Sequence, residues 1–422
     1  MHNVPTKIQL KSFGNAIRKQ WGKKVAIPKT WVDAFSLLED MLEESEDERK
    51  VVFIDEMPWM DAPRSGFVAA FEHFWNGWAT ARKDILLIIC GSASSWIINK
   101  IFKNRGGLHN RVTTRIHLHQ FTLAECEQYA KVLDLGITRN DILEGYMVMG
   151  GVPYYWSKLD RKQSIHQNIN NLFLHPDGEF RYEFNDLYES LSDRPEQYIK
   201  IIEQLAMHKS GMTRDAIMKG IGKKSGGEIT NALEDLMKCG FVRKYCHTGK
   251  LVKNALFQLI DCYSLFYFQF VRYADSTDND FWLKQLVSHR YSTWCGLAFE
   301  RVCLLHVKQI LSSLGISGVQ TEVHSWHTKA VDGHNGAQID LLIDRSDNVV
   351  SICEMKYSKK AYSVSKDDFE NISNKLNVFE QCSGINKGMQ PVIVTPNGMA
   401  TGSYSHIFHR EITADDLFRS SN

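Results

Sequence analysis

A short run of apolar residues that ends in two carboxylates constrains the fold more than any other stretch of the sequence. Residues 51–54 are Val-Val-Phe-Ile, and Asp55 and Glu56 follow directly. A strand that is apolar without alternation is typical of a parallel sheet that helices cover on both faces. Ligands bind such sheets outside the carboxyl ends of the strands. The sequence therefore predicts a fully buried central strand that delivers two acids to a ligand site.

A second apolar run strengthens this prediction. Residues 85–90 are Ile-Leu-Leu-Ile-Ile-Cys, and the small residues Gly91 and Ser92 follow. Residues 67–82 between the two runs are rich in aromatics and predict a helix, so the segment reads as a strand–helix–strand unit. A Gly-rich loop with Arg105 and Arg111 comes next, and residues 115–118 suggest a short strand. The arginines either reach a neighbouring site or belong to a solvated turn.

Local signals place several further helices. Thr30 is the predicted N-cap of an amphipathic helix over residues 30–44, and Thr122 with Glu125 forms a capping-box pattern. Gly150, Gly151 and Pro153 predict a helix end followed by a turn.

The totals limit the classes of protein that fit this chain. With 422 residues, two or three domains are expected, and the composition of 43% hydrophobic and 23% charged residues is that of a globular protein. The net charge of +1 excludes a global polycation, so nucleic acid would be bound by a local patch. Nine unpatterned cysteines predict a reducing cytoplasm. Neither a signal peptide nor a membrane-spanning segment is predicted.

The C-terminal third carries a second set of acids. Residues 338–344 and 349–356 predict a hairpin, with Asp340 in the first strand and Glu354 and Lys356 in the second. Glu354 and Lys356 share a face because alternate side chains of a strand point the same way, and Asp340 can join them. The two acids, with Glu300 on an upstream helix, are predicted ligands of a divalent metal ion, and Lys356 would stabilise a pentavalent phosphorane or position water. An exposed hairpin of mixed charge is the alternative.

The middle of the chain predicts a winged helix-turn-helix. Helical patterns over residues 196–207, 214–219 and 228–239 precede two extended segments, 241–246 and 253–260. A phosphate-contacting set is formed by Lys219, Lys223, Lys224, Lys250 and Lys253. The last helix, however, carries Glu228, Glu234 and Asp235, which a DNA-reading helix ordinarily avoids. DNA binding and a role in interdomain packing both stay open.

At this point the chain resembles a known family. The segments FIDEMPWMDAPRSGF, LLIICGSASSWI, GGLHNR, FTLAEC and MGGVPYY, in this order, resemble prokaryotic AAA-type ATPases of the archaeal-ATPase kind, in the STAND-like branch. The resemblance covers about residues 25–160. It implies a P-loop NTPase sheet that uses ATP and Mg²⁺, with Asp55 on the magnesium ion and Glu56 activating water. It also implies that Ser92 lies near the sensor position, that Arg111 is the family's loop arginine, and that such domains oligomerise.

The sequence departs from this family in one respect. The family's phosphate-binding loop lies roughly a hundred residues before the acidic strand, whereas only 50 residues precede Val51 here. The pattern GxxxxGK[ST] does not occur, and Gly222-Lys223-Lys224 has the wrong spacing. Without this loop and its lysine, the triphosphate loses its main binding site. The prediction is an incomplete P-loop sheet that lacks its first strand, with impaired ATP binding.

The C-terminal acids and lysine bring a second resemblance, to the PD-(D/E)xK nuclease fold, over about residues 285–420. The ATPase family named above commonly carries a C-terminal domain of this kind, described as a domain of unknown function. Such domains often bind without cutting, and the substrate cannot be identified from the sequence.

The predicted fold is therefore α/β, in four parts. They are a partial ATPase domain (1–160), a linker or helical lid (161–195), a winged helix-turn-helix (196–275) and a restriction-endonuclease-like domain (285–422). The predicted function is an ATPase-family protein, impaired in ATP binding, coupled to a nuclease-like domain associated with DNA. The alternatives are a non-catalytic regulatory or DNA-binding remnant, and a metal-dependent nuclease that works without ATP.

Overall fold

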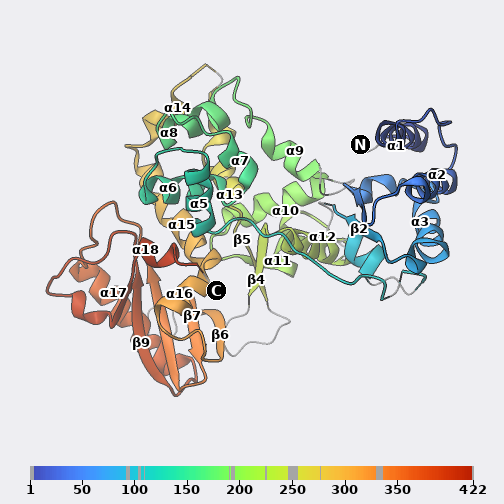
Figure 1. Ribbon diagram of the computed structural model, residues 1–422. Coiled ribbons are helices and arrows are strands. Elements are labelled where there is room, and N and C mark those ends of the chain that lie inside the picture. The colour runs from blue at the N-terminus through green and yellow to red at the C-terminus, as the bar shows by residue number, and fades with distance from the viewer. Residues whose placement is uncertain are drawn as a thin grey trace. The chain divides into compact units, whose positions relative to one another are not determined.

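The chain forms two compact units with mixed α/β structure (Figure 1). The computed structural model describes residues 4–91, 96–102, 106–108, 110–189, 191, 195–223, 226–245, 255–275, 277–328 and 336–420. The first unit comprises Met1–His117 with Tyr188–Pro195, and the second comprises Leu118–Leu187 with Glu196–Asn422. Within these described ranges, no helix has the length and apolar character needed to cross a membrane.

The first unit contains a two-stranded parallel sheet and three main helices. Its helices are α1 (Thr6–Trp21), α2 (Trp31–Glu44) and α3 (Phe67–Gly77), its strands are β1 (Lys50–Ile54) and β2 (Ile85–Ile89), and its short turns of helix are η1 (Met57–Met60), η2 (Ala79–Ala81) and η3 (Ile97–Phe102). Thr30 caps α2 in a capping box, as predicted. The predicted helix over residues 67–82 is shorter, because Trp78 leaves the helical conformation and only η2 follows.

The sheet of the first unit is buried on one face only, which corrects the prediction of a strand buried on both. Val52 and Ile54 lie in a core with the aromatic rings of α2 and α3. Val51 and Phe53 are 62% and 59% exposed, and Leu86 and Ile88 of β2 are 56% and 40% exposed. The register pairs Val51 with Leu86 and Phe53 with Ile88, so all four side chains share the uncovered face. The apolar sequence specifies strands here, but the helices of this unit cover a single face.

The second unit begins with a helical layer. Its helices are α5 (Leu123–Val132), α6 (Arg139–Met149), α7 (Pro153–Ser157) and α8 (Ile165–Ile169), followed by η4 (Asn170–Leu174), α9 (Glu183–Glu189), α13 (Cys262–Gln269), η6 (Val271–Tyr273) and α14 (Phe281–Gln285). Thr122 caps α5 as predicted. The predicted strand over residues 115–118 is absent from the described chain, and Ile116 is 78% exposed, because these residues find no pairing strand.

The units divide at residues 117/118 and again at 187/188 and 195/196, so the residues of the predicted domain 1–160 are shared between them. The reason is that α6 packs against α13 and α15, far along the chain. Within residues 161–195, predicted as a linker or helical lid, the side chains of Phe173 and Phe180 are buried.

Residues 196–260 form three helices beside a small antiparallel sheet. The helices are α10 (Pro195–Met207), α11 (Arg214–Gly220) and α12 (Gly226–Lys238), and the strands are β3 (Met212–Thr213), β4 (Val242–Tyr245) and β5 (Leu256–Leu259), in the order β3-β5-β4. Thr213 caps α11, as its sequence predicts.

The C-terminal part is a five-stranded mixed sheet with flanking helices (Figure 1). Its strands are β6 (Thr321–Thr328), β7 (Ala337–Arg345), β8 (Val349–Met355), β9 (Gly388–Val394) and β10 (Arg410–Ile412), and its helices are α15 (His289–Leu305), α16 (Val307–Ser313), α17 (Lys366–Cys382), η7 (Ser405–Ile407) and α18 (Ala414–Leu417). The order is β10-β9-β8-β7-β6, antiparallel from β6 to β8 and parallel from β8 to β10. The predicted hairpin and the predicted helix over residues 366–382 are confirmed.

Candidate functional site

The first candidate site lies where β1 and β2 end. The strands are parallel, so Asp55 after β1 and Cys90 after β2 emerge at the same edge of the sheet. The Cys90 thiol donates a hydrogen bond to Asp55 Oδ1 at 2.6 Å. Burial and this bond raise the pKa of Cys90. Asp55 is exposed, as a ligand of a bound ion or nucleotide would need to be.

The turn after β1 holds Glu56 in an unusual conformation. Its φ of 48° lies in the left-handed region, which is unfavourable for a residue with a long side chain. The Met57 amide donates to the Cys90 carbonyl at 3.0 Å, which closes the turn against β2. Gly91 makes this approach feasible, because a Cβ there would lie 2.5 Å from Pro58 Cδ. Strained residues of this kind concentrate at functional sites.

The ATPase resemblance implies two further residues, Ser92 and Arg111. Ser92 lies outside the described residues. Arg111 is exposed on an extended segment.

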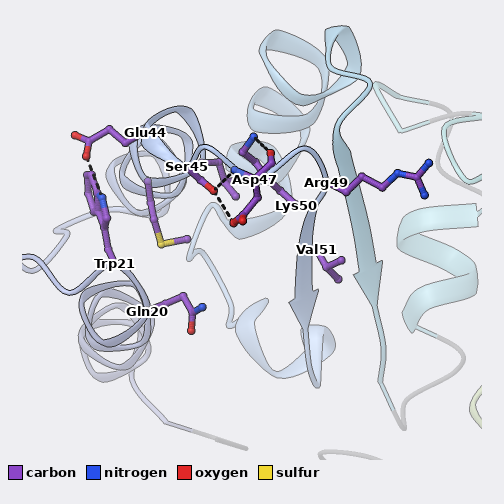
Figure 2. Close-up of a pocket in the computed structure, with 10 residues that line it drawn as sticks. Gln20, Trp21, Glu44, Ser45, Asp47, Arg49, Lys50 and Val51 are labelled. Atoms are coloured by element: carbon purple, nitrogen blue, oxygen red, sulfur yellow. Dashed lines mark hydrogen bonds between the residues drawn. The ribbon is translucent and has the colours of Figure 1, made fainter.

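A cavity of about 350 Å³ lies in the same unit, but at the amino-terminal end of β1 (Figure 2). Figure 2 shows Trp21 donating to Glu44 and Lys50 turned toward Asp47. Because Asp55 and Glu56 follow the other end of the strand, this cavity is separate from them.

The second candidate site lies on the hairpin of β7 and β8. The antiparallel register of β7 and β8 ends at the pair Leu341–Cys353, and Asp340 and Glu354 are the next residue on each strand. The pairing of β6 with β7 is irregular between His324 and Trp326, where three steps along β7 match two along β6. A β-bulge of this kind re-aims a side chain, and bulges are frequent beside active sites. The bulge falls at Asp340 and Leu341.

Glu300 on α15 joins these two acids. Burial raises the pKa of Glu300 to about 7, and the neighbouring carboxylates of Asp340 and Glu354 contribute to the rise. A carboxyl group whose charge is disfavoured in this way is characteristic of acids gathered to bind a cation. Glu300 thus lies within electrostatic reach of Asp340 and Glu354, and the role of the three acids as metal ligands stays a prediction.

Two lysines share the Glu354 carboxylate. Lys356 Nζ lies 3.1 Å from Oε1, and Lys375 Nζ of α17 lies 2.8 Å from Oε2. Burial lowers the pKa of Lys356, but the adjacent Glu354 carboxylate outweighs burial, and the pKa of Lys356 is raised. Lys356 is therefore held as a cation beside the acids.

Two arginines also lie near the acids of the cluster. Arg301 is 2% exposed, donates to the carbonyls of Leu259 and Lys209 at 3.1 Å and 2.6 Å, and lies 3.8 Å from Glu300. Burial and the nearby Arg301 lower the pKa of Arg243, on β4, to about 10, while Asp340 and Glu300 act in the opposite direction. The small sheet of β3 to β5 therefore brings its own cation to the edge of the acid cluster.

The end of β8 is fixed from the helical layer. Tyr357 donates to Glu144 Oε1 of α6 at 2.7 Å, and His166 Nε2 lies 2.6 Å from the other oxygen of Glu144. Burial raises the pKa of Glu144, but these two partners outweigh it, and the pKa of Glu144 is lowered. The Tyr357 ring also contacts Phe299, with ring centroids 6.0 Å apart. These contacts hold the residues next to Lys356 and Glu300.

Carboxylate oxygens are the ligands that Mg²⁺ and Mn²⁺ prefer. Among the described residues, no group of three or more His, Cys, Asp or Glu side chains is arranged to hold a metal ion. Lysines occupy both oxygens of Glu354. In the described part of the chain, the acids therefore do not fit a bound divalent ion.

The sequence pattern did not single out Lys375, Arg301 or Arg243. Lys375 had a detectable signal, since it falls in the apolar stripe of its helix, three residues after Ile372 and four before Phe379. A lysine in such a stripe faces the sheet rather than solvent. Arg301 had no signal beyond its neighbour Glu300.

Comparison with known proteins leaves the family open. No family model and no curated protein matches the sequence. The Walker-type ATPase PABY2304 of Pyrococcus abyssi is a structural neighbour with a TM-score of 0.41 and 15% sequence identity, over 61% of this chain and 75% of that chain. A TM-score this low does not establish a common fold, so the function has to come from this chain's own residues.

Proposed function

We propose that the C-terminal part of this chain is a metal-dependent phosphodiester-cleaving site of the PD-(D/E)xK kind, acting on nucleic acid. The observation that carries this proposal is the ion pair of Lys356 with Glu354 at 3.1 Å, with Asp340 just beyond the last pair of the hairpin and Glu300 within electrostatic reach of both acids. Three carboxylates are a donor set for Mg²⁺ or Mn²⁺, and such an ion would polarise a phosphoryl oxygen. Lys356 would stabilise the negative charge that develops on the phosphorus oxygens or position the attacking water.

Nucleic acid as the substrate is supported by the adjoining helices and hairpin. Residues 196–260 have the order of elements of a winged helix-turn-helix, namely α10, α11 and α12 followed by the β4–β5 hairpin. Lys219 and Lys223 would contact phosphates, while Lys224, Lys250 and Lys253 lie outside the described residues. The acids of α12 are partly engaged inside the protein, since Tyr198 donates to Asp235 at 2.8 Å and Lys223 lies 3.4 Å from Glu228.

The experiment is a cleavage assay of the full chain on supercoiled and branched DNA with Mg²⁺ or Mn²⁺. We expect cleavage by the wild type and its loss in Lys356→Ala, by at least about a hundredfold, because one preorganised cation contributes on that order. Lys366→Ala is the matched control, since Lys366 pairs with Glu370 on the exposed part of α17. Equal cleavage by the wild type and Lys356→Ala would refute the proposal.

A non-catalytic DNA-binding protein is the second candidate. It is favoured by the two lysines on Glu354, which compete with a metal ion for that carboxylate. In that case the full chain retards DNA in a gel, yet neither Mg²⁺ nor Mn²⁺ brings cleavage.

For the N-terminal unit, we propose an origin in an ATPase domain that no longer binds ATP well in this chain. Asp55 and Glu56 sit at the shared edge of two parallel strands, where they would contact magnesium and the attacking water. The sequence has no GxxxxGK[ST] to hold the phosphates. We expect negligible binding of labelled ATP, whereas micromolar affinity that Asp55→Ala abolishes would contradict this.

Oligomerisation through this unit is part of the same proposal, and sedimentation of the full chain tests it.

A further inference from the structure

The cavity at the amino-terminal end of β1 combines aromatic, apolar and acidic side chains (Figure 2). Trp21 is the last residue of α1. Met41, Leu42 and Glu44 belong to the last turn of α2, and Asp47 lies in the loop before β1. Leu42 is buried and Met41 is half-buried, so this side of the lining is apolar. Figure 2 shows Glu44 and Asp47 apart from each other, so the two carboxylates mark separate points of the lining.

The chain places an ammonium group of its own on this lining. Lys23 pairs with the Glu44 carboxylate, and its Nζ also lies over the Trp21 ring, 5.0 Å from the ring centroid. Trp21 Nε1 donates to the same carboxylate at 3.2 Å, which holds the ring beside it. An aromatic face next to a carboxylate is a favourable environment for an organic cation. The residue that occupies Glu44 therefore shows which chemistry this part of the lining binds, namely an alkylammonium group.

The two bases of the loop are directed away from the carboxylates of the lining. Lys50 is buried, and its ammonium group donates to the Asp47 carbonyl at 2.8 Å and to Asp84 Oδ2 at 2.9 Å. Figure 2 shows Arg49 extending away from the side of the cavity that α1 and α2 form. Residues 43–50 contain five acids against these two bases, so the local charge is negative. A negative field of this kind concentrates cations near the cavity.

We propose that this cavity binds a small aliphatic diamine, with one ammonium group in the place of Lys23 on Glu44 and the other on Asp47. The methylene groups between them would lie against the apolar side of the lining. Lys23 and Glu44 are 54% and 51% exposed, and an ion pair this exposed contributes little to stability, so a ligand can replace Lys23. Asp47 accepts from Ser45 through Oδ2 at 2.9 Å, and among the described residues nothing donates to its Oδ1, so that oxygen is open to the second ammonium group.

The inference is independent of the proposed function, because every residue that it uses belongs to the N-terminal unit. The cavity volume of about 350 Å³ suits a short unbranched chain. The alternative is that the acidic loop attracts any cation without a defined site. A single ammonium group, a second ammonium group and the position of each carboxylate have separate effects on affinity, so the two readings can be told apart.

The first test is isothermal titration calorimetry of the full chain with putrescine, an unbranched aliphatic diamine, and with n-butylamine, which has one ammonium group. We expect putrescine to bind about tenfold more tightly, because only the diamine makes the second charge-assisted hydrogen bond. Asp47→Asn should lower the affinity for putrescine to that of n-butylamine and change the affinity for n-butylamine little. Equal binding of the two amines by the wild type would refute the proposal.

The second test concerns the other end of the ligand. Glu44→Gln, which keeps the shape of the side chain, should weaken putrescine binding about tenfold. Lys23→Met removes the competing ammonium group and should strengthen binding about fivefold. Glu46→Gln is the matched control, because Glu46 is exposed in the same loop but is not a residue of the lining. It removes the same charge and should change the affinity by less than about twofold, since an exposed charge outside the site is screened by salt.

Two results would overturn the proposal. An equal loss of affinity in Glu44→Gln and Glu46→Gln would show that the acidic loop attracts cations without a defined site. Failure of Lys23→Met to bind putrescine would refute the site even if Glu44→Gln folds poorly, because Lys23→Met retains every side chain that the ligand contacts. Neither result bears on DNA cleavage by the C-terminal site, which the assay with Lys356→Ala tests separately.

Discussion

His306, between α15 and α16, uses both of its ring nitrogens within the protein. Its Nδ1 lies 2.8 Å from the Val302 carbonyl, and its Nε2 accepts from the Leu123 amide at 3.0 Å. The ring is therefore neutral with the proton on Nδ1. Leu123 opens α5, so His306 satisfies an amide that the helix itself cannot. A single buried side chain thus joins the helical layer to the C-terminal helices.

The first prediction concerns this histidine and pH. Burial lowers the pKa of His306 from 6.5 to about 4, so the unfolded chain takes up a proton before the folded one does. The stabilisation is complete above pH 6.5 and is lost as the pH falls toward about 4, by about 3 kcal/mol. His306→Gln keeps an acceptor but does not titrate, so urea unfolding of this variant should depend less on pH in this window. A His306→Gln variant that keeps the full pH dependence of the wild type in this window would contradict the prediction.

The second prediction concerns Gly151. A Cβ at this position would lie 1.9 Å from the Phe121 carbonyl oxygen. The backbone would have to shift to relieve this clash. Gly151→Ala should lower the free energy of unfolding by about 3 kcal/mol or more, as overpacking against backbone does. Gly296 inside α15 is the matched control, because a Cβ there meets nothing within 4 Å. Gly296→Ala should stabilise by up to about 1 kcal/mol, and thermal unfolding that ranks the two variants the other way would refute the argument.

At the scale of elements, Arg301 connects α15 to two segments of the small sheet. It donates to Leu259 of β5 and to Lys209 of the turn before β3, and Gln258 donates to the same Lys209 carbonyl at 2.6 Å. The planar guanidinium donates to both carbonyls at once. The ammonium group of a lysine, on a shorter side chain, cannot do so.

The third prediction follows from these bonds. Arg301→Lys should destabilise the protein by about 2–4 kcal/mol, because at least one buried carbonyl loses its donor. Chemical denaturation measures this loss. Arg410→Lys, at an exposed position, should change the stability by less than about 0.5 kcal/mol. If the two substitutions cost the same, the bonds of Arg301 contribute no stability of their own.

The elements differ in how far the sequence determines them. The helix over residues 366–382 has a local signal, a capping box at its start. The hairpin has one in its turn, where Asn348 adopts a φ of 66°. The bond from the Leu123 amide to His306 spans 183 residues, and no local sequence pattern predicts it. The same holds for the site, since alternation in β8 predicted Glu354 and Lys356, whereas Lys375 reaches Glu354 only through the packing of a helix on the sheet. The burial of β1 was mispredicted because distant elements decide which faces of a sheet are covered.

At the scale of the whole molecule, the chain crosses three times between two units that each have buried cores of their own. Residues 111–122 span the first crossing without helix or strand, and Ile116 and Leu118 are 78% and 87% exposed. Compact units connected in this way are cut by proteases in the connection before they are cut elsewhere in folded structure.

The fourth prediction is that trypsin cuts after Arg111 and Arg115 in the native protein, while the bond after Arg301 resists until the second unit unfolds. Both arginines of the connection are exposed, whereas Arg301 lies inside a helix and is 2% exposed. Mass spectrometry of fragments from a short digestion tests this order. Cleavage after Arg301 before either arginine of the connection would show that the units are not as described.

The uncovered face of the N-terminal sheet affects how the protein behaves in solution. Four large apolar side chains lie together there, from Val51, Phe53, Leu86 and Ile88, and such a patch attracts other apolar surfaces. Light scattering should therefore rise with protein concentration and with sulfate, and a mild non-ionic detergent should reverse it. Phe53→Lys should reduce both the scattering and the fluorescence of a hydrophobic dye, whereas Val132→Lys, at an isolated exposed position, should reduce neither. The choice of buffer will then decide whether this protein can be concentrated at all.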